Sequence, residues 1–168
     1  VSAIDEAPRN LILLIGDGMG PAQVKAYRMY ADDPSTEVID PLAIDPLMVG
    51  SVATDSIQLE CGDGQTTDCA RVPFATTDSA SSATAYATGR DTLVGRISMD
   101  LAGADMQTLL EKAKMRGKGT GMVVTSEVTH ATPAAFAAHV AHRDQKVDIA
   151  DQYFDRKWSG ESMIDVLL

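Results

Sequence analysis

Small residues dominate one stretch of the sequence, FATTDSASSATAYATGR at residues 74–90, and they restrict how this part of the chain can fold. A surface helix usually carries larger apolar residues at a helical period, and a linker usually carries glycine, serine and proline without alanine. Neither pattern fits this stretch. It instead predicts a helix that begins near Ser79 and whose first turn comes close to another group.

Asp78 and Ser79 stand at the predicted start of this helix, where backbone N–H groups have no partner within the helix. These N–H groups and the helix dipole would stabilise a phosphoryl group on the Ser79 hydroxyl. No G-x-S-x-G sequence surrounds Ser79, so a bound metal ion is the predicted activator of this hydroxyl. The alternative is that both residues only cap a tightly packed helix.

A second motif, NLILLIGDGMG at residues 10–20, places an acid directly after an apolar run. The run at 10–16 predicts a strand buried on both faces of a parallel sheet. Asp17 would then lie beyond the carboxyl end of that strand, where open α/β sheets bind ligands. The glycine spacing does not match a dinucleotide loop, so we interpret Asp17 as a ligand for a divalent cation. A plain glycine turn with a capping aspartate is the alternative.

A third motif, THATPAAFAAHVAHR, occupies residues 129–143. His130 and Thr132 follow a predicted buried strand, and the Thr132 hydroxyl is a plausible Mg²⁺ ligand beside carboxylates. Arg143 follows an alanine-rich helix and offers a planar guanidinium that can bind two phosphate oxygens. Alternatively, Thr132 caps the helix and Arg143 is a solvated charge. We interpret the two other histidines as ordinary residues of the helix face, namely His139 and His142.

The composition excludes some classes of function. With 14 basic and 24 acidic residues the net charge is −10, which argues against a nucleic-acid-binding surface. Phosphate chemistry would therefore need local positive charge. No apolar run approaches the length of a membrane span and no signal-like segment remains at the start, so we expect a mature N-terminus.

The two cysteines, Cys61 and Cys69, flank the polar loop GDGQTTD. A short disulfide formed in an oxidising compartment is the favoured interpretation, and two free thiols are the alternative.

Along the chain, helices are predicted at residues 21–31, 105–117, 133–142 and 147–158, besides the one from Ser79. Strand-like runs occur at 10–16, 49–54, 119–128 and 163–168. This alternation predicts an α/β fold, a three-layer αβα sandwich with a largely parallel central sheet. No domain boundary is visible, and a strand at the very end suggests that residues 1–168 are the N-terminal portion of one longer catalytic domain.

Taken in order, the segments NLILLIGDGMG, TTDSASSATAYATG and TSEVTHATPAAFAAHVAHR resemble the three N-terminal signatures of the alkaline phosphatases. The resemblance covers nearly the whole chain. It implies hydrolysis of small phosphate monoesters through a phosphoserine at a site with two Zn²⁺ and one Mg²⁺ ions. It also suggests a homodimer in the periplasm or outside the cell.

By the same resemblance, Ser79 is the nucleophile and a zinc ligand, and Arg143 binds the phosphate group. Asp17 and Thr132 are metal ligands, and Asp78 orients the arginine.

The family differs between Asp and His at the position of His130, so this chain resembles the His-bearing forms, with the histidine near the magnesium.

The remaining metal ligands of the family lie downstream of residue 168, so we expect the fragment alone to be inactive and to need the C-terminal part of the protein. Two alternatives stay open. One is another metallohydrolase of the superfamily, such as a phosphodiesterase, a sulfatase-like enzyme or a phosphomutase. The other is a non-catalytic module that binds phosphate or metal.

Overall fold

The computed structural model describes residues 9–60, 70–74 and 76–168. Backbone contacts divide the chain into two compact units, residues up to Val49 and residues from Gly50 onward. The predicted disulfide partners Cys61 and Cys69 lie outside the described residues.

In the first unit, the predicted helix at 21–31 is confirmed as α1 (Pro21–Ala31). Pro21 occupies its first position, where a missing N–H costs no helical hydrogen bond. A short 3₁₀ helix, η1 (Asp45–Leu47), follows later in the chain. Arg28 of α1 donates both Nη groups to the Asp45 carboxylate, with Nη2 at 2.7 Å from Oδ1. This ion pair connects α1 to η1.

The strand predicted at residues 10–16 is not formed. Leu11, Ile12, Leu13 and Leu14 are between 50% and 90% exposed, and they make no strand ladder with any described residue. A buried strand needs neighbouring strands for its backbone groups and covering layers for its side chains. None of the sheets formed by described residues includes this segment.

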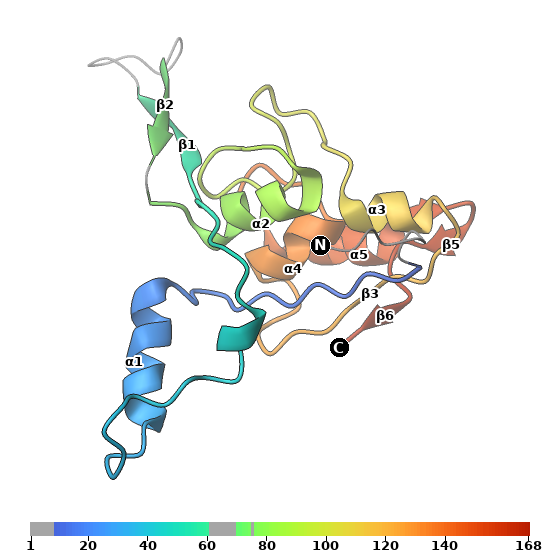
Figure 1. Ribbon diagram of the computed structural model, residues 1–168. Coiled ribbons are helices and arrows are strands. Elements are labelled where there is room, and N and C mark those ends of the chain that lie inside the picture. The colour runs from blue at the N-terminus through green and yellow to red at the C-terminus, as the bar shows by residue number, and fades with distance from the viewer. Residues whose placement is uncertain (1–8, 61–69, 75) are drawn as a thin grey trace. The chain divides into compact units, whose positions relative to one another are not determined.

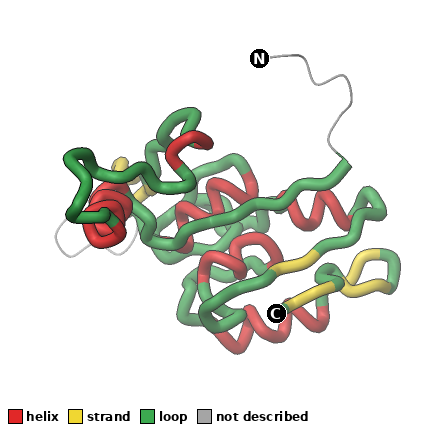
Figure 2. The backbone as a smooth tube through the Cα atoms, turned by 60° about the horizontal axis from the view of Figure 1, so that its bottom comes forward, coloured by secondary structure: helices red, strands yellow, loops and turns green. Residues whose placement is uncertain are grey.

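The second unit carries four helices and six short strands among its described residues (Figures 1 and 2). The helices are α2 (Ser79–Thr88), α3 (Leu109–Lys114), α4 (Ala131–Ala137) and α5 (Lys146–Asp155). The strands are β1 (Ser56–Glu60), β2 (Ala70–Phe74), β3 (Gly121–Met122), β4 (Lys157–Trp158), β5 (Glu161–Ser162) and β6 (Val166–Leu167). β1 and β2 pair antiparallel, as do β4 and β5, whereas β3 and β6 pair parallel.

Several predicted boundaries shift in this unit. The strand-like run at 49–54 has no ladder, and the chain becomes a strand only at Ser56. The helix predicted at 147–158 ends at Asp155. Its last two predicted residues instead form β4, the first strand of the β4–β5 hairpin. Ser159 and Gly160 turn the chain back between the two strands, because both adopt positive φ, at 51° and 85°. The parallel pair β3–β6 confirms strands within the runs at 119–128 and 163–168.

The small residues of the opening stretch pack one helix against another. Ala80 and Ala83 of α2 and Ala131, Ala134 and Ala135 of α4 are at most 2% exposed and belong to one core cluster. Short side chains let two helices approach closely, and α2 and α4 form the largest helix–helix contact of the unit. The group that comes close to α2 on this face is therefore another helix.

Side chains from three distant segments complete the end of α4. The last carbonyls of a helix lack partners within it. Here the bonds run from Ser98 Oγ to Ala135 O (2.5 Å), from Thr108 Oγ1 to Phe136 O (2.6 Å) and from Arg156 Nη1 to Ala137 O (3.5 Å). The helix predicted at 133–142 therefore runs instead from Ala131 to Ala137, and the residues after it are extended.

We predict that Ala134→Leu lowers the free energy of unfolding by about 1–3 kcal/mol, because the added carbons have no space between α2 and α4. Urea unfolding followed by circular dichroism measures this. Ala85→Leu is the matched control, since Ala85 lies in α2 but is only half-buried. Equal stability of the two variants would contradict the packing account.

Candidate functional site

The start of α2 is built around the Asp78 side chain. Asp78 is the N-cap, and its Oδ1 accepts hydrogen bonds from the Ser81 backbone N–H (3.0 Å) and the Ser81 hydroxyl (2.8 Å). The predicted helix start is confirmed, because Ser79 is the first residue of α2. Ser79 is half-buried at the end of the helix where backbone N–H groups point outward.

Arg143, the last residue of the third motif, connects that motif to the start of α2. Its Nη1 donates to Asp78 Oδ2 at 3.0 Å, and its Nη2 lies 3.2 Å from Nε2 of His130. A guanidinium only donates, so His130 Nε2 is the acceptor. His130 Nδ1 also lies 3.5 Å from the Thr132 backbone N–H. A neutral imidazole accepts a hydrogen bond at only one of its two nitrogens. We assign the accepting nitrogen to the shorter contact, which is the one with Arg143.

The backbone beside the site reinforces this pairing. Gly95 donates its N–H to Asp78 Oδ1 at 3.2 Å and accepts from the Arg143 N–H at 2.7 Å. The φ of Gly95 is 79°, and a Cβ atom there would meet the His142 ring at 2.9 Å. The left-handed φ therefore favours glycine at this position.

The environment of Asp78 keeps its carboxylate ionised. Partial burial alone would raise the pKa of Asp78, but the hydrogen bonds from Ser81, Gly95 and Arg143 together outweigh burial and lower the pKa below its usual value. Asp78 thus carries a negative charge in contact with the Arg143 guanidinium, and its role in orienting that arginine stays a prediction.

The other predicted site residues are placed as follows. Thr132 lies in the first turn of α4 and is half-buried. Asp17 lies in a turn of the first unit that precedes α1, and its partnership with Ser79 stays a prediction. No three His, Cys, Asp or Glu residues gather into a possible metal site within residues 9–60, 70–74 and 76–168.

Sequence reasoning missed two groups of residues. Ser81 has a detectable signal, because it stands three residues after an N-cap aspartate, but Gly95 has none. His139, interpreted as a helix-face histidine, lies beyond the end of α4 and is only 6% exposed. Its buried partner is Glu111 of α3, at 2.8 Å.

Ser79 is the first residue of α2 and follows Asp78, whose carboxylate accepts from Arg143; a helix N-terminus with an arginine nearby is an arrangement that phosphate-binding α/β proteins often use. The family model for alkaline phosphatases matches residues 8–168, and the chain belongs to this family. None of the described helices is long and apolar enough to cross a membrane.

Individual relatives agree with this membership. The chain is 43% identical over 160 residues to alkaline phosphatase 3 of Bacillus subtilis, covering 95% of this chain and 32% of that protein. A cold-active alkaline phosphatase of a Shewanella species matches with a TM-score of 0.63 and 34% identity, over 92% of this chain and 34% of that one. The likeness confirms the predicted alkaline-phosphatase-like α/β fold, while the strands among the described residues form three two-stranded sheets, of which one is parallel, in place of the predicted central sheet.

A variant of the alkaline phosphatase from the Antarctic bacterium TAB5, solved with Mg bound, matches with a TM-score of 0.50 and 27% identity. The match covers 68% of this chain and 29% of that one. The chain thus spans only about a third of the length of the relatives that it matches.

We predict that Asp78→Asn flattens the acid dependence of stability. The native pKa of Asp78 lies below its unfolded value, so its ionisation stabilises the fold above about pH 4, and this contribution disappears as the pH falls through the native pKa. Urea unfolding at neutral pH and near pH 3 should show a smaller loss in the variant than in the wild type. Asp151→Asn, an exposed position on α5, is the control and should follow the wild type.

Proposed function

We propose that this chain forms part of an enzyme that hydrolyses phosphate monoesters through a phosphoserine at Ser79. One observation carries the proposal: Ser79 opens α2 directly after Asp78, whose carboxylate holds Arg143. Family membership supports the same reaction class. The remaining metal ligands would come from sequence outside these 168 residues, so we expect the fragment alone to be inactive.

In the proposed first step, Ser79 Oγ attacks the phosphorus of the ester. The new Oγ–P bond replaces the bond to the alcohol, which leaves with a proton. In the second step a water molecule attacks the phosphoserine, and the Ser79 hydroxyl and inorganic phosphate are released. The N–H groups that open α2 stabilise the negative phosphoryl oxygens in both steps.

Arg143 binds the phosphate oxygens that do not react. A guanidinium has five N–H donors, and the contacts with Asp78 and His130 use one on each Nη group. The donors that remain are arranged to bind two oxygens of one phosphate side by side. A doubly charged terminal phosphate suits this arginine best, which favours a monoester over a diester.

Metal ions complete the proposal. Asp17, Ser79 and Thr132 offer carboxylate and hydroxyl oxygens, which suit Mg²⁺ and are compatible with Zn²⁺. Bound divalent ions would supply a lowered pKa for the attacking hydroxyl or water and positive charge for the leaving oxygen. We propose two zinc ions and one magnesium ion, with His130 near the magnesium, and the Mg described in the Antarctic relative supports a metal-dependent site.

The proposal extends to the setting of the protein. By family resemblance we propose a homodimer in the periplasm or outside the cell. The acidic net charge of −10 supports small phosphate esters, rather than nucleic acids, as partners.

Other superfamily reactions and a non-catalytic module are the alternatives. Turnover of a phosphate monoester, a phosphate diester and a sulfate ester by the full-length protein distinguishes them. Preferential cleavage of the monoester supports the proposal. A faster reaction with either other ester, or none with all three after loading with zinc and magnesium, contradicts it.

We predict that Ser79→Ala lowers kcat for monoester hydrolysis at least about 10³-fold in the full-length protein, because the nucleophile is removed. Ser82→Ala is the matched control on the same helix, since the Ser82 hydroxyl only donates to the Asp78 carbonyl. Mass spectrometry of protein quenched during turnover should detect phosphate on Ser79 in the wild type. A Ser79→Ala protein with the full rate would disprove the assignment.

We predict that Arg143→Ala weakens competitive inhibition by inorganic phosphate about 10- to 100-fold, because charge-assisted hydrogen bonds are lost. The rate should be reduced but measurable. Arg116→Ala, an exposed residue after α3, is the control. An unchanged inhibition constant in Arg143→Ala would exclude a phosphate-binding role.

A further inference from the structure

A buried hydrogen bond between a histidine and a glutamate lies apart from the proposed catalytic residues. His139 is 6% exposed and Glu111 is 5% exposed, and the His139 Nε2 lies 2.8 Å from Glu111 Oε1. The other ring nitrogen, Nδ1, lies 2.7 Å from the carbonyl oxygen of Ser98. Both ring nitrogens thus face acceptors, and the ring links α3 to the segment around Ser98.

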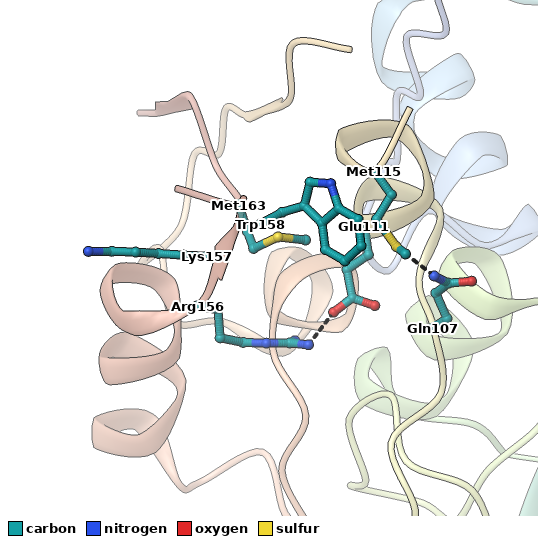
Figure 3. Close-up of a pocket in the computed structure, with 7 residues that line it drawn as sticks. All are labelled: Gln107, Glu111, Met115, Arg156, Lys157, Trp158 and Met163. Atoms are coloured by element: carbon teal, nitrogen blue, oxygen red, sulfur yellow. Dashed lines mark hydrogen bonds and ion pairs between the residues drawn. The ribbon is translucent and has the colours of Figure 1, made fainter. Parts of the chain in front are cut away.

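Glu111 is held firmly enough to act as an anchor. Its Oε2 accepts the Thr108 N–H at 2.9 Å in the capping box of α3, and Arg156 Nη2 lies 2.5 Å from its Oε1. Figure 3 shows Arg156 reaching this carboxylate at the edge of a small pocket. Partial burial would raise the pKa of Glu111, but hydrogen bonds from His139 and Thr108 and the Arg156 charge lower it.

Ser98, the other partner of His139, has an unusual backbone. Its φ is 45°, a left-handed conformation that a residue with a side chain adopts only when its surroundings enforce it. Its N–H donates to Thr84 Oγ1 at 2.9 Å, and its hydroxyl donates to the Ala135 carbonyl at 2.5 Å. The His139 ring completes these contacts through the Ser98 carbonyl oxygen.

A single antiparallel bridge, between Ile97 and Val140, lies between this point and the proposed phosphate site. Ile97 and Val140 exchange both backbone hydrogen bonds at 3.1 Å, and the Arg143 N–H donates to the Gly95 carbonyl at 2.7 Å. His139 therefore stands at one end of this pairing and Arg143 stands at the other.

We propose that His139 is a positioning residue for Arg143. Its ring, anchored by Glu111, fixes the register of segment 138–143 against segment 95–98. This register sets the backbone of Arg143 and of Gly95, whose N–H and carbonyl contact Asp78 and Arg143. The inference rests on the proposed role of Arg143 in binding phosphate.

A histidine that only fills the core would act on stability alone. A positioning histidine has an effect on phosphate binding that requires Arg143. His139→Asn separates the two cases, because the shorter amide can still reach Ser98 but cannot reach Glu111. Ile149→Val is the control, since it creates a cavity in the same core without touching the polar network.

The experiment is a double-mutant cycle in the full-length enzyme, with the inhibition constant of inorganic phosphate as readout. We expect His139→Asn to weaken phosphate inhibition roughly 10-fold when Arg143 is present, through misplacement of the guanidinium. In an Arg143→Ala background the same change should have almost no effect. Ile149→Val should leave the inhibition constant unchanged in both backgrounds.

Equal weakening by His139→Asn in both backgrounds, or none in either, would overturn the inference. If His139→Asn does not fold, Glu111→Gln takes its place, because glutamine keeps the length and an acceptor for Thr108 while removing the charge.

Hydrogen exchange separates this inference from the proposed function. We expect the amides of Val140 and Arg143 to exchange about tenfold faster in His139→Asn than in the wild type, relative to Ile149→Val. Should Arg143→Ala leave phosphate inhibition unchanged, the proposed phosphate-binding role fails, while faster exchange at these amides still supports the positioning role. Unchanged exchange rates would refute that role directly.

Discussion

The carboxylate of Asp78 connects the parts of the site in the second unit. One oxygen accepts from Ser81 and Gly95, and the other accepts from Arg143. A half-buried carboxylate with this many donors keeps its charge, and that charge determines where the guanidinium lies. The start of α2 and the segment that carries Arg143, 65 residues apart, are joined by this side chain.

Alanine packing makes this junction possible. With Ala80 and Ala83 facing Ala134 and Ala135, α2 and α4 approach each other closely. Ser79 is the first residue of α2, and Thr132 lies in the first turn of α4. The small residues that are unusual in the sequence therefore serve the interior, and two of the residues proposed for the chemistry, Ser79 and Thr132, lie in the first turns of the two helices.

The sequence predicted these helix starts well, because caps and turns depend on local residue types. The start of α2 after Asp78 and the start of α1 at Pro21 are examples. The sequence predicted poorly those contacts that depend on residues far away in the chain. The apolar run at 10–16 indicates burial but not its neighbours, and His139 carries no signal of its pairing with Glu111, 28 residues away. Gly95 likewise shows its importance only once His142 and Asp78 are located.

The way α4 ends has a consequence for how the molecule reaches its native state. A seven-residue helix is too short to persist alone in water. Its terminal carbonyls find partners only when Ser98, Thr108 and Arg156 have arrived from elsewhere in the chain. Formation of α4 is thus cooperative with closure of the surrounding core, because the partners of its last carbonyls come from that core.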